Sequence, residues 1–199
     1  MELELYKRRT SVLRLDTFAI PETRFPIARL LVEPSFEPDW VVSVYHPEGG
    51  KCRIIATVAE KNVYYANQQV IHRMGSMRQQ PAKIDATVHE ATIPCDAADQ
   101  VGNAWKTILS HLVPAKVGDP MLLDGVAYTA IRSTDLLGYA CGRVGSPPEG
   151  SPADRLSTLG ATLLNYAQAD ERSRGRLVSR LRKLAGELAL VKPPANVDP

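Results

Sequence analysis

Residues 96–113, DAADQVGNAWKTILSHLV, are predicted to form the helix around which the rest of the fold packs. Its apolar residues recur at the spacing of one helical face and its polar residues fall largely on the other, namely Val101, Ala104, Trp105, Ile108, Leu109 and Leu112 against Gln100, Asn103, Lys106 and Ser110. Asp96 is the predicted N-cap, Asp99 follows at a capping-box position, and Pro114 ends the helix. Trp105 is the largest side chain on the apolar face, so we expect it to anchor the helix in the core.

The segments before this helix are predicted to be strands. Residues 11–20 alternate between polar and apolar side chains, and residues 27–32 form a second, shorter candidate. Residues 40–45 and 52–58 are rich in β-branched and aromatic residues, and the glycines of Pro47-Glu48-Gly49-Gly50 supply a turn between them. These two segments therefore predict a hairpin. Residues 84–93 alternate again and lead directly into the helix.

The segments after the helix predict another hairpin, a further strand and two more helices. Residues 121–123 and 126–131 flank Asp124-Gly125, a pair typical of a type I′ turn, and residues 136–144 form the further strand. The second helix is predicted to begin after Ser151, which is a typical N-cap residue. Pro152 suits the first helical position, and Asp154 is an acid in the first turn. A break near Asp170 separates this helix from a third one, which directs four leucines inward: Leu177, Leu181, Leu184 and Leu188.

Together these elements predict an α+β fold, a mostly antiparallel sheet with two to three helices packed on one face. Residues 1–191 are predicted to form a single domain and residues 192–199 a flexible C-terminal tail. The 199 residues are 44% hydrophobic and 23% charged, as in ordinary globular proteins. No apolar run is long enough for a membrane span, and the start MELELYKRR has no apolar core of a signal peptide.

The cysteine content predicts thiols in a reducing compartment. Three cysteines, Cys52, Cys95 and Cys141, are too few for a disulfide scaffold and odd in number. We therefore expect mostly buried free thiols and a cytoplasmic location.

Histidine and cysteine recur at one spacing, His46-x5-Cys52 and His89-x5-Cys95. Both residue types bind zinc, but zinc sites in small domains usually use tighter spacing, so no metal is expected. A thiol nucleophile needs a base such as His46 beside Cys52, or a helix N-terminus such as the one after Cys95. If the protein is an enzyme, its site is expected among distant residues that no motif reveals: His46, Cys52, His89, Cys95 and Asp124.

Common catalytic and cofactor motifs are absent from the sequence. There is no phosphate-binding G-x-x-x-x-G-K-[ST], no dinucleotide-binding G-x-G-x-x-G before a helix, and no G-x-S-x-G nucleophile elbow. The sequence therefore predicts neither a cofactor nor one of these familiar reaction classes.

The third predicted helix carries a run of basic residues with no acid between them: Arg172, Arg174, Arg176, Arg180, Arg182 and Lys183. Such a face is either solvated or a contact surface for an acidic partner, and Arg174, Arg180 and Lys183 are the candidate binding residues. Aromatic residues do not interleave with the arginines, and the net charge is only +2, so nucleic acid is not the expected partner.

The leading functional hypothesis is a non-enzymatic protein-binding domain of bacterial type. It would mask a toxin or effector, as an immunity or inhibitor protein does, through proline-rich loops on a rigid sheet. Two alternatives remain open. One is an enzyme with the non-local His, Cys and Asp site, and the other is a nucleic-acid-associated protein that uses the arginine-rich helix.

Overall fold

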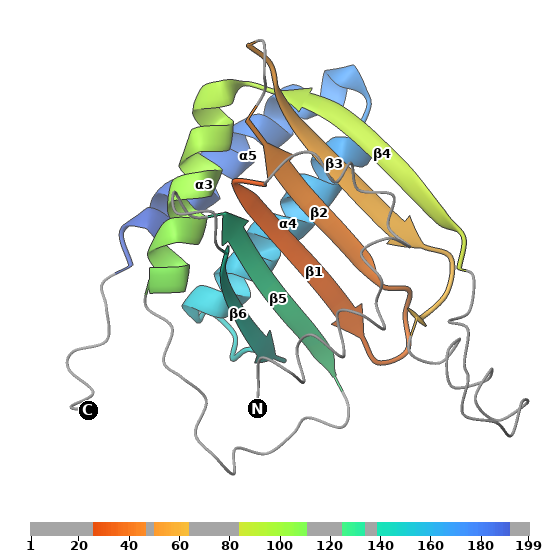
Figure 1. The fold of residues 1–199 in the computed structure, drawn as a ribbon. Helices are drawn as coiled ribbons and strands as arrows, with labels where there is room; N and C mark the ends of the chain where they lie inside the picture. Colours follow the sequence, from red (N-terminus) through yellow and green to blue (C-terminus); the bar gives the residue numbers. More distant parts are fainter. Residues whose placement is uncertain (1–25, 47–49, 64–83, 111–124, 134–138, 192–199) are drawn as a thin grey trace, which may run out of the picture.

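The computed structural model describes residues 26–46, 50–63, 84–110, 125–133 and 139–191. Six strands form one antiparallel sheet in the order β4-β3-β2-β1-β5-β6. They are β1 (Ala28–Pro34), β2 (Trp40–Tyr45), β3 (Cys52–Ala59), β4 (Ala86–Ile93), β5 (Val126–Ser133) and β6 (Tyr139–Gly145). Three helices, α3 (Cys95–Ser110), α4 (Pro152–Gln168) and α5 (Glu171–Ala189), cover one face of this sheet (Figure 1). The predicted α+β class is confirmed.

The main core lies between the sheet and the helices. Alternate strand residues such as Leu30, Val42 and Ile54 face α3 and α4, while α5 packs mainly on those two helices. Trp105 is fully buried there, and its indole Nε1 donates a hydrogen bond to the carbonyl oxygen of Arg29 at 3.0 Å. The predicted role of Trp105 as the anchor of its helix is confirmed.

A smaller apolar cluster lies on the opposite face of the sheet, and it consists of Leu31, Val41, Ala59, Val63 and Ile84. β1 is therefore buried on both faces, as a central strand should be. Asp39 is also buried at this cluster, and its Oδ2 accepts a hydrogen bond from the backbone N–H of Val63 at 2.5 Å.

Most of the predicted elements are confirmed. β1 to β4 lie where the sequence placed strands, β6 covers the described part of residues 136–144, and α4 has Ser151 as its N-cap, with the hydroxyl accepting from the Asp154 N–H. Asp170 caps α5. The predicted strand at 11–20, the end of the first helix beyond Ser110, and the tail at 192–199 lie outside the described residues, and the single-domain boundary stays a prediction.

One local prediction, the N-cap of the first helix, is wrong. α3 begins at Cys95, and the carbonyl of Pro94 accepts from the N–H groups of Ala97 and Ala98, so Asp96 is not the cap. β5 pairs with β1 along one edge and with β6 along the other. The other half of the predicted hairpin, residues 121–123 with Asp124, lies outside the described residues. In α5 all four predicted leucines face the core, with Leu181 and Leu188 fully buried and Leu177 and Leu184 partly buried against it.

Candidate functional site

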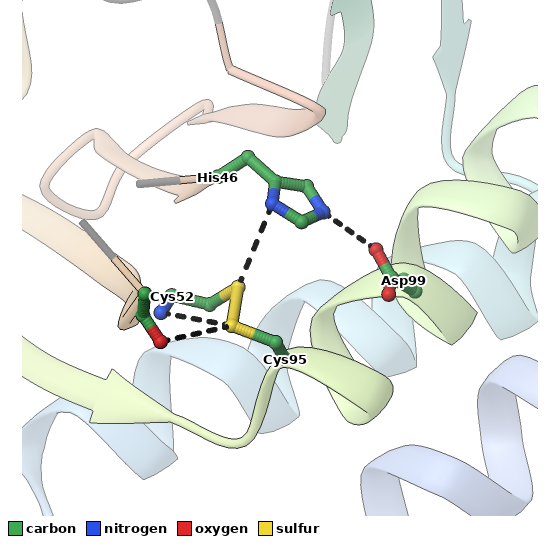
Figure 2. The surroundings of a disulfide bond; sticks show 5 residues. His46, Cys52, Cys95 and Asp99 are labelled. Carbon is green, nitrogen blue, oxygen red and sulfur yellow. Dashed lines mark hydrogen bonds and ion pairs between the residues drawn. A yellow bond between two sulfur atoms is a disulfide. The ribbon is translucent and has the colours of Figure 1, made fainter. Parts of the chain in front are cut away.

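A disulfide joins the sheet to the first helix (Figure 2). Cys52 is the first residue of β3 and Cys95 is the first residue of α3. Antiparallel pairing places Cys52 opposite Ile93, two residues before Cys95, and the two Cα atoms lie 5.2 Å apart. The expectation of mostly buried free thiols is wrong for this pair, and it is wrong for Cys141 too, which is a free thiol but exposed.

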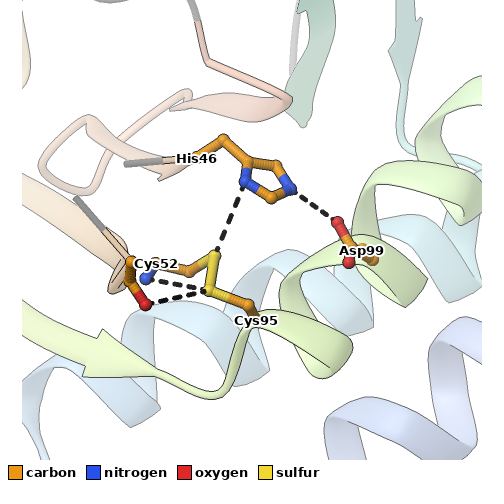
Figure 3. A network of polar contacts seen from close by, with 5 residues as sticks. His46, Cys52, Cys95 and Asp99 are labelled. Atoms are coloured by element: carbon orange, nitrogen blue, oxygen red, sulfur yellow. Dashed lines mark hydrogen bonds and ion pairs between the residues drawn. A yellow bond between two sulfur atoms is a disulfide. The ribbon is translucent and has the colours of Figure 1, made fainter. Parts of the chain in front are cut away.

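A histidine and an aspartate lie beside the disulfide (Figure 3). His46 follows β2, and its Nε2 lies 2.7 Å from Oδ1 of Asp99, one turn into α3. Its Nδ1 lies 3.9 Å from Sγ of Cys52. A neutral His46 that donates its Nε2–H to Asp99 directs the Nδ1 lone pair toward that sulfur. The imidazole of His46 therefore lies between the carboxylate of Asp99 and the sulfur of Cys52.

The two sulfur atoms have different surroundings. Cys52 is fully buried, whereas Cys95 is partly exposed. Cys95 lies at the N-terminus of a 16-residue helix, and its Sγ is 3.1 Å from the backbone nitrogen of Cys52, which points its N–H at the sulfur. The positive end of a helix and a hydrogen-bond donor both favour a thiolate over a thiol. Cys95 is thus the more exposed cysteine of the pair, and its position favours a thiolate over a thiol once the disulfide is reduced.

Of the five residues named for an enzyme site, the structure brings three together. His46, Cys52 and Cys95 are neighbours, whereas His89 lies on β4 opposite Ala56, four residues along that strand from Ile93. Asp124 lies outside the described residues. Sequence reasoning missed Asp99 because its position suggested a capping role. Its four-residue spacing from Cys95 was the available signal, since that spacing puts two side chains on one helix face.

The described residues contain no group of three or more histidine, cysteine, aspartate and glutamate side chains that could hold a metal ion. The His46, Cys52 and Cys95 cluster uses its sulfur atoms in the disulfide instead. Cysteine binds a metal as the thiolate, so the oxidised pair offers no such ligand.

The predicted basic surface on α5 is only partly available. Arg180 and Lys183 are exposed, but Arg174 is partly buried with its guanidinium 5.7 Å from the centre of the Tyr166 ring. Arg182 binds Asp96 on α3 through two N–H groups, at 3.0 and 2.8 Å. The face that remains toward solvent consists of Arg172, Arg176, Arg180 and Lys183, which we call the α5 basic face.

No protein-family model, no curated protein and no solved structure matches this chain. Within the described ranges, every helix is too short or too polar to cross a bilayer. The geometry around the disulfide is therefore the main guide to function.

Proposed function

We propose that the protein exchanges thiols and disulfides with a protein dithiol, and that Cys52, Cys95, His46 and Asp99 form its active site. The observation that carries this proposal is the asymmetry of the disulfide. One cysteine is partly exposed at a helix N-terminus, and the other is buried beside an imidazole held by a carboxylate. Exchange requires an accessible sulfur to be attacked and a stabilised leaving sulfur, and this pair offers both.

The first step is attack by a substrate thiolate on Sγ of Cys95. A bond forms between the substrate sulfur and Cys95, the Cys52–Cys95 bond breaks, and Cys52 leaves with the electron pair. Nδ1 of His46 accepts the proton that the substrate thiol loses and then gives it to the Cys52 thiolate. Asp99 holds the ring in place, with its Oδ1 2.7 Å from Nε2 of His46.

The second step releases the substrate. The other thiol of the substrate, as its thiolate, attacks the substrate sulfur in the mixed disulfide, and Cys95 leaves as a thiolate. The dipole of α3 and the N–H of Cys52 stabilise this anion. In sum, the substrate dithiol is oxidised to a disulfide, the Cys52–Cys95 pair is reduced to a thiol and a thiolate, and the proton of the second substrate thiol passes to water.

The rate of this exchange tests the proposal. Oxidised protein is mixed with dithiothreitol, and the two thiols that form are trapped with an alkylating agent and counted by mass spectrometry. Replacing His46 with Gln should slow the exchange roughly tenfold or more, because the proton transfer at Nδ1 is lost. His89→Gln is the matched control because His89 lies away from the disulfide.

Two results would contradict the proposal. One is an equal rate for the His46→Gln and His89→Gln variants. The other is a disulfide that dithiothreitol reduces only when the protein is unfolded, because that behaviour belongs to a structural crosslink. The cytoplasmic location expected from the sequence stays a prediction, and in that compartment a disulfide is usually transient and catalytic.

A second candidate function is binding of an acidic protein partner, the toxin or effector expected from the sequence. The α5 basic face supports it, because Arg172, Arg176, Arg180 and Lys183 are exposed without an ion pair among the described residues. Exposed charges of one sign attract an oppositely charged partner and speed its association.

Reversal of two of these charges tests the second candidate. Proteins captured from the native cell are identified, and each is then titrated with wild-type protein and with the Arg180→Glu/Lys183→Glu variant over a range of salt. Binding of an acidic protein should weaken with salt and be lost in the variant. Equal binding by both proteins, or retention of nucleic acid alone, would contradict an acidic protein partner.

A further inference from the structure

Arg29 is a buried arginine at the centre of the sheet face opposite the helices. It is 7% exposed, and it lies on β1 with Ser43 of β2 as its cross-strand neighbour. Its Nε donates a hydrogen bond to the Ser43 hydroxyl at 2.9 Å, and its Nη2 donates one to the Tyr45 hydroxyl at 3.1 Å. Two neutral hydroxyls therefore hold the guanidinium in a fixed orientation.

The charge of Arg29 is not neutralised by any carboxylate of the described residues. Each acid at this face is engaged elsewhere: Glu33 with Arg143 at 3.2 Å, Glu90 with Arg53 at 2.9 Å, and Asp39 with the N–H of Val63. A guanidinium stays protonated in proteins, and burial of an unpaired charge is costly. The buried charge of Arg29 therefore lacks a counter-ion among the described residues.

The unused part of the guanidinium determines which anion fits. The Nε and Nη2 edge faces the two hydroxyls, and no described residue accepts a hydrogen bond from the edge formed by Nη1 and Nη2. Two parallel N–H groups on that edge match the two oxygens of a carboxylate. The neighbours on the same face are apolar, with Leu31 on the same strand and Ile131 opposite Arg29 on β5, both buried.

A second polar atom on this face also lacks a partner. The hydroxyl of Thr57 is buried, and it makes no hydrogen bond within the part of the chain that the structure describes. Thr57 lies opposite Val41 on β2, two residues from Ser43. This face therefore carries a guanidinium without a counter-ion and a hydroxyl without a hydrogen-bond partner among the described residues, both surrounded by apolar side chains, which is the composition of a small-molecule site.

We propose that Arg29, with Ser43 and Tyr45, binds the carboxylate of an aliphatic acid on the sheet face opposite the helices. The guanidinium forms the bidentate contact with the carboxylate, the two hydroxyls position the guanidinium, and Leu31 and Ile131 contact the aliphatic part. This site is separate from the disulfide, so it holds whether or not the thiol exchange occurs.

Calorimetric titration of the full chain with sodium hexanoate tests this site. Hexanol, which lacks the charge, and inorganic phosphate, which lacks the chain, are titrated alongside. Wild-type protein should bind hexanoate in a saturable way and more tightly than either comparison probe. Arg29→Gln should weaken the binding by tenfold or more, whereas Arg53→Gln, a half-exposed arginine on the same face, should not.

If Arg29→Gln does not fold, the Tyr45→Phe variant provides a second test of the site. It removes one positioning hydroxyl and leaves the guanidinium, so hexanoate binding should weaken severalfold. Three results would overturn the site: no saturable binding of hexanoate by the wild type, equal affinity for hexanoate and hexanol, or tighter binding of phosphate than of hexanoate.

Discussion

The indole Nε1 of Trp105 lies 3.0 Å from the carbonyl oxygen of Arg29 and donates a hydrogen bond to it. This bond connects the buried centre of α3 to the backbone of the central strand. The two residues are 76 positions apart in sequence, so the contact forms only when helix and sheet have packed together.

Replacement of Trp105 with Ala should lower the free energy of unfolding by roughly 3–5 kcal/mol, because the change leaves a large cavity in the core. Trp105→Phe should cost less, since it keeps most of the volume and loses only the hydrogen bond and part of the ring. Denaturant titration measures both. A loss below about 1 kcal/mol for the alanine variant would mean that Trp105 does not anchor the core.

A methyl group added at Gly160 of α4 should destabilise the protein. The new Cβ would collide with the Cδ2 atom of Leu30, a fully buried residue of β1, and overpacking typically costs about 1–3 kcal/mol. Gly175→Ala on α5 is the matched control because its Cβ would meet open space, and it should stabilise the helix by roughly 0.5–1 kcal/mol. Similar effects of both changes in thermal unfolding would refute the close packing at Gly160.

Asp39 should make stability depend on pH. Burial raises the pKa of its carboxyl from 3.8 to about 6, so the folded protein binds this proton more tightly than the unfolded chain does. The contribution of Asp39 to stability is therefore present at low pH and is lost as pH rises from about 4 to about 6, in total about 3 kcal/mol.

The Asp39→Asn variant isolates this effect. Asparagine keeps an oxygen that can accept from the Val63 N–H but has no charge to bury. The stability of the variant relative to the wild type should increase with pH over that range, as measured by urea titrations at several pH values. A constant difference between the two proteins would contradict the raised pKa.

Loss of the disulfide should lower stability. The bond joins residues 43 positions apart, and a loop of this length restricts the unfolded chain by about 4 kcal/mol in the chain-entropy account. The Cys52→Ala/Cys95→Ala variant should show a loss of this order in denaturant titration. Cys141→Ala removes an exposed thiol and serves as the control.

The elements defined by local chemistry were predictable from the sequence. Ser151, Pro152 and Asp154 start a helix through contacts within four residues, and the β2–β3 hairpin needs only a turn between two apolar segments. The pairing of β5 with β1 was not predictable in this way. Its partners, such as Leu31 and Thr129, are about a hundred residues apart, and the Asp124-Gly125 pair pointed to a nearby partner instead.

The residues of the candidate site could mostly be named from the sequence, but their proximity in the fold could not be predicted. His46, Cys52 and Cys95 were all named, but their meeting depends on the β3–β4 register, which the sequence does not specify. Asp99 and Asp96 both suggested a helix cap. In the folded protein their carboxylates bind His46 and Arg182 from other elements, and those contacts exist only after packing.

The position of β1 in the sheet has a consequence for synthesis of the chain. β1, β2, β3 and β4 emerge first and pair with one another in order, but the second edge of β1 has to wait for β5, which begins at Val126. Until the ribosome has released that segment, a nascent chain presents an unpaired strand edge beside Leu30 and Val32. Such an edge is a template for pairing with other chains. Translation that stalls before β5 should therefore favour aggregation, whereas a stall after β6 should not.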